Sequence, residues 1–84
     1  MKKGTTSTGF SFEVDENRFN NMEFLDALAE SSENALAFPR ALSLILDKDQ
    51  KQRLYDHVRT EDGRVPFESI DREITEIMEI CSKN

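Results

Sequence analysis

The segment RTEDGRVPFESID, residues 59–71, contains the residue pattern in this sequence that comes nearest to a metal site. An acidic pair, a glycine and an apolar residue two places later also occur in the calcium loop of an EF-hand, where side-chain oxygens replace water around the ion. With Gly63 at the sixth place, the first, third, fifth and twelfth places fall on Val58, Thr60, Asp62 and Ser69. Because Asp62 alone supplies a carboxylate there, we expect no calcium site. The segment is interpreted as a turn between two helices, with Glu61 and Asp62 solvated.

Other residue types that carry chemistry are too few or too scattered to form a catalytic or metal centre. The sequence has one histidine, His57, and one cysteine, Cys81, and two such ligands do not make a zinc site. Its three glycines are separated, so no phosphate-binding loop is present, and no serine lies in a glycine-flanked elbow. We expect His57 near a helix end or in solvent, and Cys81 as a small buried hydrophobe. The protein is predicted to have no cofactor and not to be an enzyme.

Length and charge limit the size of the core and the kinds of partner. A chain of 84 residues makes one domain with a thin core. The 17 acidic residues outnumber the 11 Lys and Arg, which are scattered, and the net charge of −6 argues against binding to nucleic acid. No window approaches the roughly 20 apolar residues that span a bilayer. With one cysteine and no signal-like start, we expect a cytoplasmic protein without a membrane partner.

The N-terminal part of the chain changes character at Phe10. Residues 1–9 are polar and lack periodicity, so they are interpreted as a flexible or weakly ordered tail, or as a weak edge strand. From Phe10 to Val14, apolar and polar residues alternate, which predicts a strand with one apolar face. Such a strand needs a partner. The threonines before it could pair with it in a hairpin, or a second copy of the protein could pair with it in a homo-oligomer.

A first helix is predicted within FNNMEFLDALAE, residues 19–30. Asn20 is expected to cap it with Glu23 completing a capping box, while Phe19 and Phe24 are placed as a hydrophobic staple. Its broad inner face is predicted to comprise Met22, Phe24, Leu25, Leu28 and Ala29. The helix should stop within residues 30–34.

A short second helix is expected to start at Pro39, within residues 35–46, the most apolar part of the chain. Pro39 disfavours a helical conformation at Phe38 and suits the first turn of a helix. The apolar residues Leu42, Leu44, Ile45 and Leu46 spread around more than one face. Either this helix is central to the core, which we favour, or one side of it contacts another protein.

Two further helices complete the predicted fold. Asp47 caps a third helix that ends near Arg59, with Leu54, Val58 and Tyr55 facing inward. Gly63 provides a turn and Pro66 lies in the first turn of the last helix, whose predicted core stripe is Phe67, Ile70, Ile74, Ile77, Met78 and Cys81. The fold class is therefore α+β and mainly α. A short N-terminal strand or hairpin precedes about four helices, with residues 10–84 forming a single domain.

The order of these segments resembles one known family. GFSFEVD, MEFLDALAE, PRALSLIL, EDGRVPFESI and ITEIMEI, within residues 9–80, resemble the small tail assembly chaperones of long-tailed bacteriophages and prophages of Gram-positive bacteria. The resemblance implies a non-enzymatic protein in the bacterial cytoplasm that binds the helical tape measure protein before the tail tube assembles around it. In many relatives a frameshifted second domain engages tail tube subunits. The polar start KKGTTSTG departs from the more apolar first strand of the relatives.

The apolar surplus of the second helix supplies a hypothesis for partner binding. The predicted contact residues are Leu36, Phe38, Leu42 and Ile45, with Leu25 from the first helix. They would hold an apolar stripe of the tape measure protein in a helix-in-groove contact, while the net charge of −6 keeps the assembly dispersed. The alternative is a small acidic regulatory protein that binds and inhibits a host protein through its acidic surface.

Overall fold

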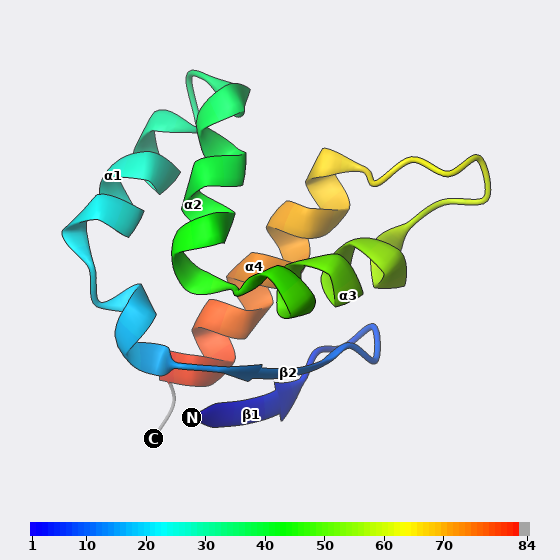
Figure 1. Cartoon of the computed structure of the whole chain (residues 1–84), viewed down its shortest axis with the longest axis horizontal. Helices are drawn as coiled ribbons and strands as arrows, with labels where there is room; N and C mark the ends of the chain where they lie inside the picture. The colour runs from blue at the N-terminus through cyan, green and yellow to red at the C-terminus, as the bar shows by residue number, and fades with distance from the viewer. Residues whose placement is uncertain (83–84) are drawn as a thin grey trace.

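The computed structural model describes residues 1–82 and has an N-terminal β-hairpin followed by four α-helices (Figure 1). In chain order the elements are β1 (Lys2–Thr5), β2 (Ser11–Val14), the 3₁₀ turn η1 (Glu16–Phe19), α1 (Met22–Glu30), the 3₁₀ turn η2 (Ala35–Ala37), α2 (Phe38–Ile45), α3 (Lys48–Val58) and α4 (Phe67–Ser82). The predicted fold class, α+β and mainly α with an N-terminal hairpin, is confirmed. None of the helices in residues 1–82 is long and apolar enough to cross a bilayer.

The hairpin forms because the apolar face of β2 needs both a strand partner and a cover. β1 pairs with β2 in antiparallel register, with Gly4 opposite Phe12. Of the two alternatives for residues 1–9, a tail or a strand, the structure therefore has a strand at Lys2–Thr5. Gly4 lacks the side chain that would collide with its neighbour, since a Cβ there would lie 2.7 Å from Cζ of Phe12. The Phe12 ring can thus lie across β1, and it is buried with only 3% of its surface exposed.

The helix α1 starts one residue later than predicted, and most of the residues predicted for its inner face are exposed. Asn21, not Asn20, is the cap, and its side-chain oxygen accepts a hydrogen bond from the Glu23 N–H at 3.0 Å. The predicted staple is present, with the rings of Phe19 and Phe24 edge to face at 5.8 Å. This contact turns Phe24 inward, and the buried residues of the helix are Phe24 and Ala27. Met22, Leu25 and Ala29 are exposed, so their assignment to the inner face is wrong.

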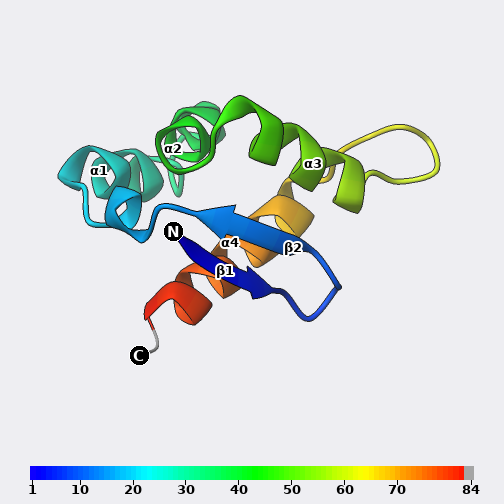
Figure 2. The same cartoon turned by 60° about the horizontal axis from the view of Figure 1, so that its bottom comes forward.

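The helix α2 is central to the core. Both views place it between α1 and α3, and it contacts both of them (Figures 1 and 2). Its buried side chains, together with the residue that follows it, are Phe38, Ala41, Leu42, Ile45 and Leu46. The favoured alternative for residues 35–46 is therefore the one observed. Phe38 itself is helical with φ −64° and ψ −45°, contrary to the expectation from Pro39, because η2 runs directly into α2 and the Phe38 ring is buried.

The last two helices begin and end close to the predicted residues. Asp47 caps α3 by accepting a hydrogen bond from the Gln50 N–H at 2.9 Å, and Leu54 is fully buried. α4 starts one residue after Pro66, whose carbonyl accepts a hydrogen bond from the Ile70 N–H at 3.3 Å. The isoleucines of its stripe, Ile70, Ile74 and Ile77, are buried, Met78 and Cys81 are partly buried, and Phe67 is exposed.

A buried carboxylate ties the tip of the hairpin to α4, which crosses beneath the strands (Figure 2). Glu73 is 1% exposed, and its two oxygens accept hydrogen bonds from the hydroxyls of Thr6 at 2.8 Å and Thr8 at 2.9 Å. Thr8 also lies 3.0 Å from Nε2 of His57, in the last turn of α3. The Thr8 hydroxyl therefore lies between the Glu73 carboxylate, to which it donates, and the His57 imidazole. One small network therefore joins the hairpin, α3 and α4.

This network gives the first testable prediction. Glu73→Ala leaves the buried Thr6 hydroxyl without its acceptor, so we expect the free energy of unfolding to fall by about 1–3 kcal/mol in urea unfolding. Glu73→Gln should lose less, since its amide can accept from one threonine and donate to the other. The matched control is Glu79→Ala, which changes an exposed carboxylate on the same helix. Equal stability of the Glu73→Ala and Glu79→Ala variants would contradict the assigned role of Glu73.

Candidate functional site

An open apolar groove lies between η2 and α2 on one side and the segment that leads from α3 into α4 on the other. Its volume is about 270 Å³, and it is lined by Ala35, Phe38, Pro39, Leu42, Tyr55, Val65, Phe67 and Ile70. No charged side chain is among these lining residues. The groove is therefore suited to take apolar side chains of another molecule.

The first turn of α4 forms one wall of the groove. It precedes the part of α4 that contacts the hairpin, where Glu73 and Ile80 lie. Phe67 leans on Phe38 with the ring centroids 4.9 Å apart and the planes at 67°, an edge-to-face contact that joins α4 to α2. This contact covers one side of the Phe67 ring, and 45% of its surface remains exposed. Between α3 and α4, residues 59–64 are exposed in a loop that extends away from the helices (Figure 1), and the chain returns to the groove at Val65. An exposed aromatic wall at a groove is a frequent anchor in protein interfaces.

The structure brings together two of the five residues predicted to contact a partner. Phe38 and Leu42 line the groove, although they are 4% and 2% exposed and thus form its floor. Ile45 is 1% exposed and belongs to the core. Leu36 and Leu25 are exposed, at 84% and 44%, but neither lines the groove.

Six of the eight lining residues are not among the predicted contacts: Ala35, Pro39, Tyr55, Val65, Phe67 and Ile70. The sequence predicts Tyr55, Phe67 and Ile70 as core residues, and Val65 is the apolar residue two places after Gly63 in the calcium-loop pattern. Val65 and Phe67 share a signal in the sequence, since both flank Pro66 at the beginning of a helix, whereas Tyr55 lies within the third helix and has no such signal. Spacing alone did not show that α2 lies opposite them.

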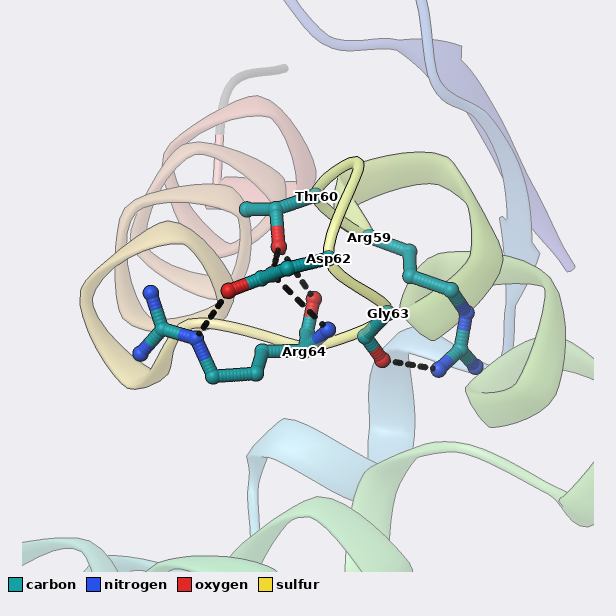
Figure 3. Close-up of polar contacts among 5 residues, drawn as sticks. All are labelled: Arg59, Thr60, Asp62, Gly63 and Arg64. Carbon is teal, nitrogen blue, oxygen red and sulfur yellow. Dashed lines mark hydrogen bonds and ion pairs between the residues drawn. The ribbon is translucent and has the colours of Figure 1, made fainter.

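The turn between α3 and α4 uses its carboxylate to hold its own backbone (Figure 3). The Thr60 hydroxyl and the Arg64 N–H donate to Oδ1 of Asp62, and Arg64 Nε donates to Oδ2 at 2.9 Å. Gly63 adopts a φ of +90°, which favours glycine, and its carbonyl accepts from Arg59 at 2.9 Å. Both oxygens of Asp62 are thus engaged within the turn. Within residues 1–82 no group of three or more His, Cys, Asp or Glu side chains could hold a metal ion.

The hydroxyl of Thr8 lies at the centre of the polar network that joins the hairpin to α3 and α4. It lies between Glu73 and His57 and contacts both of them. The exposed ring of His57 also lies 5.4 Å from that of Phe10, at the helix end where it was expected. The cluster therefore serves to position the hairpin.

Cys81 is partly buried near the end of α4. Burial raises the pKa of its thiol, the nearby charge of Glu16 raises it further, and Lys2 acts in the opposite direction. A raised pKa leaves less of the nucleophilic thiolate at neutral pH. The side chain thus behaves as an apolar group at the edge of the core.

Asp62 gives a prediction that can be measured by NMR. Hydrogen bonds from the Thr60 hydroxyl, the Arg64 side chain and the Arg64 N–H lower the pKa of Asp62 below its ordinary value of 3.8. Because the pKa of Asp62 is lower in the folded protein than in the unfolded chain, ionised Asp62 stabilises the turn at pH values above 3.8. This stabilisation is lost as the pH falls through the lowered pKa of the folded state. In a titration followed by carboxyl ¹³C shifts, Thr60→Val should raise the pKa of Asp62, whereas Thr5→Val in β1 should leave it unchanged. An unaltered midpoint in Thr60→Val would refute the assigned cause.

Comparison with protein-family models, with curated proteins and with solved structures finds no match for this chain. Function must therefore be argued from the groove, from the charges around it and from the order of the sequence segments.

Proposed function

We propose that this protein is a non-enzymatic tail assembly chaperone of a bacteriophage or prophage, which binds the tape measure protein in the groove between α2 and α4. The observation that supports the proposal is the open apolar groove itself, with Phe67 exposed at its wall. Its volume of about 270 Å³ is small for a metabolite site, since such sites usually enclose about 300–1,000 Å³. A row of apolar side chains from a helix suits a shallow groove of this size.

The tape measure protein is the proposed partner because its chemistry complements that of the groove. A long amphipathic helix left alone exposes an apolar stripe that promotes aggregation. A small domain that covers part of this stripe and carries a net charge of −6 would keep the complex dispersed in the bacterial cytoplasm. The resemblance over residues 9–80 supports the same partner. Tail tube subunits are the second proposed partner, as the resemblance implies.

The acidic face of α4 favours the alternative function of a small regulatory protein that binds a host protein. A shallow depression there is lined by Ser7, Glu68, Asp71, Arg72, Thr75, Glu76 and Glu79. A partner held by this face would be basic, and its affinity would fall steeply as salt is added. Binding in the apolar groove should change little over the same range of salt.

Co-expression with the proposed partner, a long helical tape measure protein that a neighbouring gene is expected to encode, tests the proposed function. We expect the two proteins to purify together, and the tape measure protein to remain in the supernatant only in the presence of the chaperone. Phe67→Ser removes the exposed anchor and should weaken the complex about tenfold or more, as the loss of a central aromatic contact does in other interfaces.

The matched control for this experiment is Leu36→Ser, which changes a more exposed apolar residue outside the groove. It should leave the complex intact. Circular dichroism melts would establish that both variants fold. Normal co-purification of a folded Phe67→Ser variant would exclude the groove as the binding site.

A further inference from the structure

The outer face of α1 carries an apolar stripe that no other part of residues 1–82 covers. Met22 and Leu25 are 68% and 44% exposed, and Ala29 is exposed one turn further on. At 100° per residue these three positions fall within an arc of about 60°. In both views α1 lies at one edge of the molecule, with α2 on one side and solvent on the other (Figures 1 and 2).

A row of acidic side chains runs beside this stripe. Glu23, Asp26 and Glu30 are all exposed and occupy a second arc, whose centre lies about 100° around the helix from that of the stripe. The segment MEFLDALAE contains no Lys or Arg. The face therefore combines three apolar positions with three negative charges, and no positive charge from the same helix neutralises them.

We propose that this face of α1 docks an amphipathic helix of a partner protein that carries Lys or Arg beside its apolar stripe. Helices pack through apolar positions three and four residues apart, and charges next to the seam determine which partner is accepted. The acidic row of α1 would meet the basic row of such a helix, while Met22 and Leu25 would pack against its apolar residues.

A second copy of this chain does not fit the same face. Its α1 would bring another apolar stripe, but also another acidic row and no cation of its own. Two molecules of net charge −6 also repel each other. The charge pattern of α1 therefore favours binding of a basic helix over binding of a second copy of this chain.

This surface is separate from the groove, because no residue of α1 lines the groove. The inference therefore goes beyond the proposed function and does not depend on which molecule occupies the groove.

Two synthetic helical peptides of about three heptads test the proposal. Both carry Leu at the seam, and one has Lys while the other has Glu at the flanking positions. Titrated into the ¹⁵N-labelled full chain, the Lys peptide should shift the amide signals of α1, and the Glu peptide should not. A peptide with the composition of the Lys peptide but without an apolar stripe controls for attraction by charge alone, and it should bind weakly or not at all.

Two substitutions in α1 separate the apolar from the charged contribution. Leu25→Gln should weaken binding of the Lys peptide about tenfold, because it removes an anchor from the seam. Asp26→Lys should weaken the Lys peptide and strengthen the Glu peptide, because it places a cation in the middle of the acidic row. Both residues are exposed, so the fold should be unaffected.

Phe67→Ser serves as the control for the separate groove and should leave the α1 shifts in place. Shifts that map to the groove instead of α1, or equal binding of the Lys and Glu peptides, would overturn the proposal. So would a concentration-dependent dimer in sedimentation that Leu25→Gln abolishes, because the occupant would then be a second copy.

Discussion

The hairpin imposes the constraint on which the rest of the fold depends. Two strands alone are not stable in water, so the apolar face of β2 must be covered by helices. The helix α4 contributes to this cover: Glu73, near its middle, bonds the tip of the hairpin, and a methyl of Ile80, near its end, lies close to Gly4. With α4 held there, its first turn extends past the strands and stands opposite α2. The groove is the space that remains at that end.

The position of α2 decides which apolar side chains are left for a partner. A chain of 84 residues buries a small share of its surface, and here the most apolar helix takes the central place. Because α1 covers one side of α2, its own outer side has no neighbour among the described elements. Among the helices, the exposed large apolar residues therefore lie on α1 and at the start of α4, and Leu36 is exposed in the η2 turn before α2. The hypothesis that α2 itself carries a surplus is replaced by two surfaces on either side of it.

Much of the fold follows from local patterns, and the departures have identifiable causes. The strand at Ser11–Val14, the staple of Phe19 with Phe24 and the cap at Asp47 depend on residues a few places apart, and all three are observed. The inner face of α1 was not determined in this way. The apolar residues of MEFLDALAE span about 220° around the helix axis, so its periodicity fits several inner faces, and packing against the rest of the molecule chooses among them.

Long-range contacts explain the features of the sites that the sequence did not reveal. Glu73 lies beside Ile70 and Ile77 on the helical arc, but the threonine that satisfies it is 67 residues away in the chain. Phe67 fits the core stripe of α4 by spacing as well as Ile70 does. Its exposure depends on where α2 and the 59–66 turn lie relative to it. The groove is formed by side chains from η2, α2, α3 and α4 together, so the pattern of no single segment predicts it.

The same arrangement that leaves apolar surface exposed also limits self-association. An open sheet edge invites pairing with another chain. Along β2 the carbonyl of Ser11 accepts a hydrogen bond from Arg53 at 2.9 Å, and β1 carries Lys3, a residue type that protects edges. On α1 the acidic row accompanies the exposed stripe, and at the groove the apolar surface is concave. Each of these three features weakens binding of a second copy more than binding of a different chain whose shape and charge are complementary. For the proposed chaperone, that difference in affinity would allow binding of an apolar helix without self-aggregation.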